Sequence, residues 1–172
     1  SLPLAGVLRQ AGVFAAEGYR ELVVTGINVG KYGLDLAEGE TIYSLLDRLC
    51  AEFPDIRLRL SSIEPTEVND RLLDIARGRA NFMPHFHIPL QSGSDKILGL
   101  MRRRYTTARF ADRIAAVRAL MPDAFIGIDV IVGFPGETEE DFRTTYDFLA
   151  GLEPAFLHIF PFSERPGTPA VE

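Results

Sequence analysis

The sequence predicts an α/β fold with about five parallel strands and helices on the outside. Short apolar segments alternate with amphipathic ones along the chain, which is typical of β-α-β units and a parallel sheet. Residues 129–132 are β-branched and apolar enough for a strand that is covered on both faces. They lead into the glycine-rich turn 133–136, where ligands of parallel α/β folds bind. Because parallel crossovers are right-handed, we expect the strands in sequence order, curled into an open part of a barrel.

The individual helices and strands are predicted from the spacing of apolar residues and from the glycine, proline and capping residues that interrupt it. Helical spacing of apolar residues starts at Leu4, and Gly18 ends this first helix. Pro54 limits the second helix, while Thr138 with Asp141 marks the start of the last one. The expected strands are residues 21–25, 57–61, 86–90, 125–132 and 156–161. The expected helices are residues 4–17, 41–51, 68–77, 94–101, 107–121 and 139–149, with a long loop at 26–39.

The composition indicates one domain of ordinary size. Apolar residues make up 47% of the 172 residues, enough for a sizeable core, and no shift in composition divides the chain. The chain opens with a helix that no strand precedes, and no helix follows the last expected strand. We therefore interpret residues 1–172 as a fragment of a larger protein.

Charge and cysteine content narrow the class of protein. The net charge of -6 argues against a nucleic-acid binder that acts alone, because such domains are usually basic. The one basic cluster, residues 102–104, is also what a solvated helix end favours. The single cysteine, Cys50, lies on an apolar helix stripe and is interpreted as a buried structural thiol, so neither a disulfide nor a cysteine metal cluster forms within the chain. With no signal peptide and no membrane-spanning run, a cytoplasmic protein without membrane contact is the default expectation.

Polar clusters follow all five expected strands. Parallel strands bring their carboxyl ends to one rim of the sheet, where barrel enzymes place their sites. Any single cluster is more often a cap or a turn, and Ser94 is a ready cap for the next helix. Five clusters at five strand ends favour a ligand site. They comprise residues 25–28, 61–65, 91–94, 133–138 and 162–169.

Two smaller constellations leave other chemistry open. His85 and His87 are two residues apart, so they point to the same face of a strand and are candidates for metal binding. A metal-dependent hydrolase on a similar barrel is therefore an alternative function, although His158 is the only other histidine and a carboxylate ligand is also needed. A structural module without a ligand is a further alternative. Glu64 and Glu137 are candidates for an acid/base pair.

Several segments, spread through nearly the whole chain, carry a resemblance to a known family. They are residues 25–28 with 32–33, then 59–65, 84–95, 101–106, 129–142, 160–163 and 165–169. In these segments the chain resembles the radical S-adenosylmethionine (SAM) core of the methylthiotransferases. Residues 61–65, Ser-Ser-Ile-Glu-Pro, are most similar to the branch that modifies N6-threonylcarbamoyladenosine in the anticodon loop of tRNA (MtaB). The isopentenyladenosine (MiaB) and ribosomal-protein (RimO) branches are the alternatives within the family.

The resemblance implies a partial TIM-like barrel of the radical SAM type and insertion of a methylthio group at C2 of the tRNA adenine. For the full-length protein it implies SAM, two [4Fe-4S] clusters and tRNA as a partner. The family's CxxxCxxC motif, its amino-terminal domain and its carboxy-terminal TRAM domain are absent from residues 1–172. We therefore expect neither metal, cluster nor catalytic residue in this fragment, and no activity. We also expect strand 21–25 to lack one neighbour and to favour self-association through that edge.

The resemblance further implies which residues bind SAM. Those after the first strand would hold the methionine amino group, and those after the second and third strands the carboxylate and ribose. Residues at the ends of the fourth and fifth strands would enclose the adenine, and residues 102–104 would reach either the methionine carboxylate or a tRNA phosphate. We expect all of them to line one cavity. The implied SAM-binding residues are Thr25, Gly26, Asn28, Ser62, Glu64, Gln91, Ser92, Ile131, Val132, Gly133 and Phe162.

Overall fold

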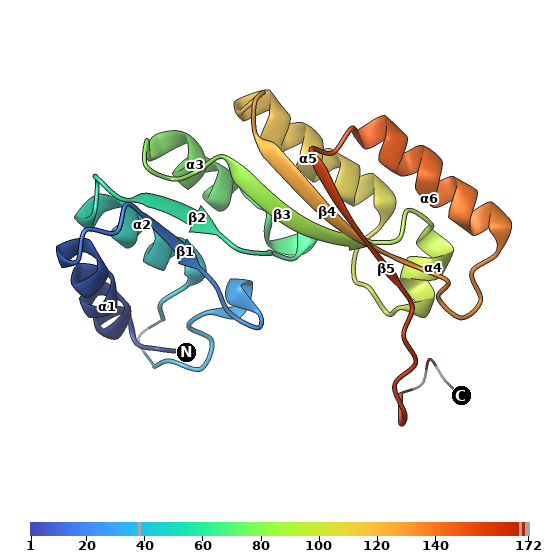
Figure 1. Cartoon of the computed structure of the whole chain (residues 1–172), viewed down its shortest axis with the longest axis horizontal. Helices are drawn as coiled ribbons and strands as arrows, with labels where there is room; N and C mark the ends of the chain where they lie inside the picture. Colours follow the sequence, from blue (N-terminus) through green and yellow to red (C-terminus); the bar gives the residue numbers. More distant parts are fainter. Residues whose placement is uncertain (38, 169, 171–172) are drawn as a thin grey trace.

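The computed structural model describes residues 1–37, 39–168 and 170, and shows five strands side by side in chain order (Figure 1). Every strand pair is parallel, which confirms the predicted α/β fold as an open part of a barrel. The strands are β1 (Glu21–Val24), β2 (Arg57–Leu60), β3 (His85–Gln91), β4 (Phe125–Val132) and β5 (Phe156–Pro161). The helices are α1 (Leu4–Ala16), α2 (Ile42–Glu52), α3 (Asp70–Gly78), α4 (Asp95–Leu100), α5 (Thr107–Leu120) and α6 (Glu139–Leu152), with short 3₁₀ turns η1 (Val29–Lys31) and η2 (Pro65–Glu67).

The strands are divided into a two-stranded sheet, β1-β2, and a three-stranded sheet, β3-β4-β5. A single parallel bridge between Leu58 and Phe82 joins the two. At this joint the Leu58 N–H donates to the Asn81 carbonyl at 2.7 Å, and the Met83 N–H donates to the Leu58 carbonyl at 2.8 Å. Among the described strands β1 pairs only with β2, so the expected edge with one missing neighbour is confirmed.

The strands of the larger sheet present an apolar face to the helices and a mixed face to the open side. Along β3, Phe86, Ile88 and Leu90 are at most 1% exposed, while the residues between them are half-buried. The β4 side chains of Ile126 and Ile128 are buried in the same core as Phe110 and Ile114 of α5. Since side chains alternate between the faces of a strand, the polar side chains of β3 and β4 gather on the face that the core does not cover.

The helices begin where side chains cap them. Thr41, Asn69, Ser94, Thr106 and Thr138 each accept a hydrogen bond from a backbone N–H in the first turn of the following helix. Ser94 is thus the cap that the sequence suggested. The start of α3 lies two residues later than expected because Asn69 caps it and η2 takes up the residues before. The end of α6 lies three residues later, where Glu153 adopts the left-handed conformation.

Two further expectations concern the interior and the membrane. Cys50 is 2% exposed among the apolar side chains of α2, which confirms a structural thiol. Every helix in the described part of the chain is too short or too polar to span a bilayer.

Candidate functional site

Two cavities open beside the carboxyl ends of the strands. The larger, of about 490 Å³, is lined by Gln91 of β3, by Asp129 and Ile131 of β4, and by Phe160 and Phe162 at the end of β5. The smaller, of about 160 Å³, lies between the loops after β1 and β2. Both are on the rim where parallel α/β folds bind ligands.

The structure distributes the implied SAM-binding residues over these cavities rather than over one. Those after the first two strands, Gly26, Asn28, Ser62 and Glu64, line the smaller cavity. Gln91, Ile131 and Phe162 line the larger one. Thr25 lies instead beside a third cavity of about 550 Å³, which runs along β1 and which Gly26 and Asn28 also line. Val132 is half-buried, and its carbonyl accepts a hydrogen bond from the Phe162 N–H at 2.8 Å. Pro169, the last residue of the fifth cluster, lies outside the described residues.

Ser92 is placed differently from its neighbours. Its side chain is fully buried, and its hydroxyl lies 3.2 Å from the Thr145 hydroxyl of α6 and accepts from the Ser94 N–H at 3.1 Å. The Gly93 N–H donates to the same Thr145 hydroxyl at 3.1 Å. Ser92 therefore fastens the loop after β3 to α6, and its hydroxyl faces protein rather than the cavity.

Gln91 carries a backbone conformation that non-glycine residues seldom adopt. Its φ is 71°, and the β3–β4 register shifts between Pro89 and Gln91. The Tyr105 hydroxyl holds this bulge by donating to the carbonyls of Pro89 at 3.1 Å and Leu90 at 2.9 Å. Burial raises the pKa of Tyr105, so the hydroxyl stays a neutral donor. Backbone strain of this kind gathers at functional sites, and here it accompanies a Gln91 side chain that lines the larger cavity.

The loop after β4 leaves open space at the rim. Gly133 has a φ of 75°, and a Cβ built on it meets nothing within 4 Å. The Gly133 N–H donates to Glu137 Oε2, while Glu137 Oε1 is buried with no hydrogen-bond partner among the described residues. Glu64 is engaged elsewhere, 3.5 Å from the Arg103 guanidinium. The two glutamates that were candidates for an acid/base pair thus have different partners.

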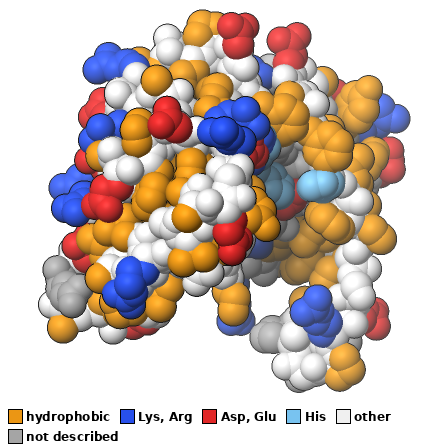
Figure 2. Space-filling view, turned by 60° about the vertical axis from the view of Figure 1, so that its left-hand side comes forward, with side chains coloured by type: hydrophobic (Ala, Val, Ile, Leu, Met, Phe, Trp, Pro, Cys, Tyr) orange, Lys and Arg blue, Asp and Glu red, His pale blue; other side chains and the backbone are white. Residues whose placement is uncertain are grey.

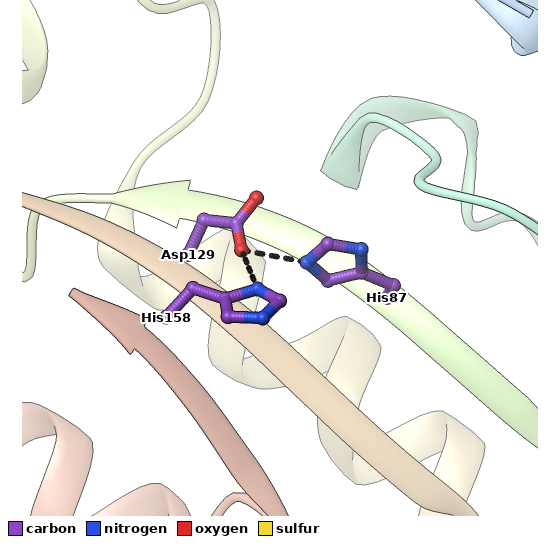
Figure 3. Close-up of side chains that lie close together, drawn as sticks. All are labelled: His87, Asp129 and His158. Carbon is purple, nitrogen blue, oxygen red and sulfur yellow. Dashed lines mark hydrogen bonds and ion pairs between the residues drawn. The ribbon is translucent and has the colours of Figure 1, made fainter. Parts of the chain in front are cut away.

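A carboxylate held by two imidazole rings occupies the open face of the larger sheet (Figure 3). Asp129 Oδ1 lies 2.6 Å from His87 Nε2 and 2.9 Å from His158 Nδ1. The other ring nitrogen of His87 lies 2.7 Å from the Ser62 hydroxyl. This network connects Ser62, which lines the smaller cavity, with Asp129, which lines the larger one.

The candidate metal ligands are therefore not the pair that the sequence suggested. His87, Asp129 and His158 offer ligand atoms within 4.8 Å of one another, whereas His85 stacks on Phe125 with ring centroids 4.8 Å apart. Burial lowers the pKa of His85, and the charge of Arg59 adds to this effect. Figure 2 shows histidine side chains reaching the surface between hydrophobic ones.

The cysteine chemistry of the chain does not fit an iron–sulfur cluster. Such clusters are held by several thiolates. Cys50 is the single cysteine, and its burial raises the pKa of its thiol to about 11, so it stays protonated at neutral pH. Residues 1–172 therefore hold no thiolate ligand set for a cluster.

The chain is similar to known proteins over most of its length. The sequence profile of the Radical SAM superfamily matches residues 1–149, and the chain belongs to that superfamily. It is 39% identical over 171 residues to a threonylcarbamoyladenosine tRNA methylthiotransferase MtaB of Rickettsia prowazekii, and the match covers 99% of this chain and 41% of the relative. The corresponding MtaB protein of Bacillus subtilis is 42% identical, covering 95% of this chain and 36% of the relative. A tRNA-2-methylthio-N(6)-dimethylallyladenosine synthase of Acidothermus cellulolyticus is 41% identical, and the match covers 96% of this chain and 33% of the relative.

A solved structure shows the same fold. Coproporphyrinogen III oxidase (HemN) from Escherichia coli, described as a radical SAM enzyme, superimposes with a TM-score of 0.69 at 19% identity. The match covers 93% of this chain and 36% of that one. The chain thus spans about two fifths of the length of the curated relatives named above, or less.

Sequence reasoning missed Asp129 and His158 as members of the site. Asp129 carries a signal, because it is a charged residue within an otherwise apolar strand between Ile128 and Val130. His158 carries none by itself, since it meets Asp129 only through the parallel register of β4 and β5.

Proposed function

We propose that residues 1–172 are the radical SAM core fragment of a tRNA methylthiotransferase, and that their rim binds SAM. The identity of about 40% with methylthiotransferases, maintained along nearly the whole chain, is the observation that carries the proposal. The rim supports it with two adjacent cavities and with strained or open backbone at Gln91 and Gly133. The superfamily assignment gives no support to the hydrolase alternative.

The two cavities suit the two ends of SAM. In the larger one, the apolar side chains of Ile131, Phe160 and Phe162 offer surface to an adenine, and Gln91 and Asp129 offer oxygen acceptors to ribose hydroxyls. In the smaller one, the Glu64 carboxylate and the Ser62 hydroxyl suit the charged methionine end. Arg103 lies against Glu64, which favours a role at the methionine carboxylate over one at a tRNA phosphate. Bound SAM would supply the radical chemistry, while these residues bind and orient it.

Catalysis would need thiolates that this chain does not supply. The expectation that residues 1–172 are inactive by themselves therefore stays a prediction. Anaerobic reconstitution with iron and sulfide, followed by an assay for 5′-deoxyadenosine, tests it. We expect no product from residues 1–172, and product from a longer parent protein that supplies the cluster cysteines. Product from residues 1–172 alone would contradict the placement of the cluster ligands.

SAM binding is tested at Gly133, with Gly18 as a matched control. Both glycines have positive φ, at 75° and 88°, and a Cβ at either position would meet open space, but only Gly133 follows a strand that lines the larger cavity. Alanine at either position costs about 1–2 kcal/mol of stability, because a side chain disfavours the left-handed conformation. In the parent protein we expect Gly133→Ala to weaken SAM binding about tenfold or more, equivalent to about 1.4 kcal/mol, with Gly18→Ala unchanged. Equal affinities of the two variants would contradict this placement.

The substrate that we propose is N6-threonylcarbamoyladenosine in tRNA. The sequence Ser61 to Pro65 supports this branch, while the overall identities to the two named kinds of relative differ little. Deleting the parent gene and analysing tRNA nucleosides by mass spectrometry provides the test. We expect the methylthio form of threonylcarbamoyladenosine to disappear while its unmodified precursor accumulates. Loss of the dimethylallyl derivative would assign the sister branch, and unchanged tRNA would point to a substrate such as a ribosomal protein.

Self-association through the β1 edge stays a prediction that light scattering can check.

A further inference from the structure

Two histidines, His87 and His158, contact the same carboxylate oxygen of Asp129, a residue that lines the larger cavity. We propose that His87 and His158 are positioning residues that clamp one carboxylate oxygen of Asp129 and so present the other oxygen to a hydroxyl group of the ligand in the larger cavity. The inference rests on the proposed function for the identity of the ligand. The contacts of His87 Nε2 and His158 Nδ1 with Asp129 Oδ1 are together called the imidazole clamp.

The distances show which ring nitrogens face the Asp129 carboxylate. An ionised carboxylate only accepts hydrogen bonds, so His87 Nε2 at 2.6 Å and His158 Nδ1 at 2.9 Å must both donate. A neutral His87 ring then has Nδ1 free to accept, and the Ser62 hydroxyl lies 2.7 Å from it. Every donor in this chain of contacts from Ser62 to His158 thereby meets an acceptor. With neutral rings, these contacts correspond to opposite tautomers, with the proton on Nε2 of His87 and on Nδ1 of His158.

The neighbouring strands hold the two rings against the Asp129 carboxylate. Asp129 lies in the middle strand, and the two rings reach it from β3 on one side and β5 on the other. Gly127 faces His87 in the β3–β4 register, and a Cβ there would lie 3.4 Å from the His87 ring. The glycine therefore leaves the ring room to lie along β4. With a ring on either side, the Asp129 carboxylate has little freedom to rotate.

The second oxygen of Asp129 is left for a ligand. No described residue forms a hydrogen bond or ion pair with Oδ2, and Figure 3 shows it pointing away from both rings. The Asp129 side chain is 17% exposed and lines the larger cavity with Gln91. A half-buried carboxylate oxygen without a partner is favourable only when a donor reaches it. A ligand hydroxyl in the cavity provides such a donor.

Hydrogen bonding explains the geometry better than a metal ion does. Around a tetrahedral zinc ion with bonds of about 2.0–2.1 Å, neighbouring ligand atoms lie about 3.3 Å apart. Here the nitrogen–oxygen distances are 2.6 and 2.9 Å, and both nitrogens share one oxygen. These are lengths of charge-assisted hydrogen bonds. We therefore propose hydrogen bonding rather than a metal ion at Asp129, and metal binding is one of the results that the experiments can distinguish.

The test pairs variants that keep the donated proton with variants that remove it. Gln places an amide N–H near the position of imidazole Nε2, and Asn places one near Nδ1, so His87→Gln and His158→Asn keep a donor toward Asp129. His87→Leu and His158→Leu fill similar space without a donor. His85→Phe is the control, because it is on the same face of β3 and keeps the ring that stacks on Phe125. SAM affinity is measured by calorimetry on the anaerobically reconstituted parent protein, with circular dichroism to verify that each variant is folded.

We expect the leucine variants to bind SAM about tenfold more weakly, and the Gln, Asn and Phe variants to stay within about threefold of wild type, because loss of a charge-assisted bond frees the carboxylate. A merely structural role would weaken the donor-keeping and donor-lacking variants alike, and that result would overturn the proposal. So would leucine variants with wild-type affinity.

Histidine tautomers provide a second readout that does not depend on SAM. In protein labelled with ¹⁵N-histidine, long-range ¹H–¹⁵N spectra should show protons on His87 Nε2 and His158 Nδ1. If these tautomers are found but wild type does not bind SAM, the clamp stands and the proposed function fails. If wild type binds SAM but either nitrogen that faces Asp129 lacks a proton, the clamp fails. Stoichiometric Co²⁺ binding with a tetrahedral absorption spectrum, lost in His158→Leu, would replace the clamp by a metal site.

Discussion

On the open faces of the two sheets, β1-β2 and β3-β4-β5, carboxylate side chains are bound in different ways. On the first, Glu21 lies 2.9 Å from Arg57 and 2.8 Å from Arg59, so both of its oxygens are engaged. On the second, Asp129 is held through one oxygen by two histidines and keeps the other free. A carboxylate between two arginines is fully satisfied within the protein. A carboxylate held from one side is prepared for a ligand, and Asp129 lines the larger of the two rim cavities.

The two parts also differ in how their edges are packed. A cavity of about 550 Å³ with mostly apolar walls lies between α1 and β1, and Val23 beside it is 55% exposed. In β3 and β4 the core-facing side chains are nearly all inaccessible, as Phe86 and Ile128 show. Among the described residues, the smaller sheet is thus packed less completely along β1 than the larger sheet is beneath its polar face.

The largest loss of stability that we expect comes from truncating a core side chain in each of the two sheets. Leu58 of β2 and Ile128 of β4 are both 0% exposed, and alanine at either position should cost about 2–5 kcal/mol of unfolding free energy. Leu58 also carries the bridge between the two sheets. Urea unfolding followed by circular dichroism should show one transition with a lowered midpoint for both variants, because one continuous core connects the sheets. Leu34→Ala, at an 80% exposed position, should change stability by about 0.5 kcal/mol or less. Two separate transitions in Leu58→Ala would show instead that the parts unfold independently.

A smaller difference in stability should distinguish the N-terminal caps of α2 and α6. Thr41 caps α2 by accepting from the Ser44 N–H at 3.2 Å. Thr138 caps α6 in the same way, but its hydroxyl donates to a carboxylate, Asp141 Oδ2 at 2.7 Å, whereas the Thr41 hydroxyl donates to Ser44 Oγ at 3.4 Å. Asp141 is 8% exposed and binds Lys96 at 2.6 Å as well, so Thr138→Ala disturbs a buried network. We expect about 1 kcal/mol for Thr41→Ala and about 2 kcal/mol for Thr138→Ala in thermal unfolding, within the range typical of such caps. Equal losses would mean that the network adds nothing to the cap.

The smallest effect concerns the pH dependence of the smaller sheet. Hydrogen bonds from Arg59 and Arg57 lower the pKa of Glu21 to about 2 from an ordinary value of 4.5. Because the folded-state pKa is the lower one, ionised Glu21 stabilises the fold above about pH 4.5, and this contribution is lost as the pH falls toward 2. Glu21→Gln should reduce the unfolding free energy at neutral pH by about 1 kcal/mol or less, with a slightly lower melting temperature, and the difference from wild type should vanish near pH 2.

Wild type and variant must be compared at each pH, since Lys96 also lowers the pKa of Asp141 and gives both proteins an acid-sensitive slope. High salt should reduce the difference, because the Glu21 side chain is 26% exposed. A difference between wild type and Glu21→Gln that persisted at pH 2 would show that packing, rather than charge, is responsible.

The sequence by itself determined the elements and their order. The apolar periodicity, the cap at Thr138 and the glycine after α1 are local features, so they predicted the strands and helices to within a few residues and placed Cys50 in the interior. Polar clusters after each strand likewise predicted a rim site, because parallel strands bring their carboxyl ends to one edge.

Only the tertiary structure decided how those elements meet. The division of the strands into two sheets, the burial of Ser92 against Thr145 and the contact of His87 and His158 with Asp129 all depend on side chains far apart in the chain. His158 lies 29 positions from Asp129, and His87 lies 42. Strand register and helix docking set such contacts, and a one-residue shift in register would turn either ring to the opposite face of the sheet.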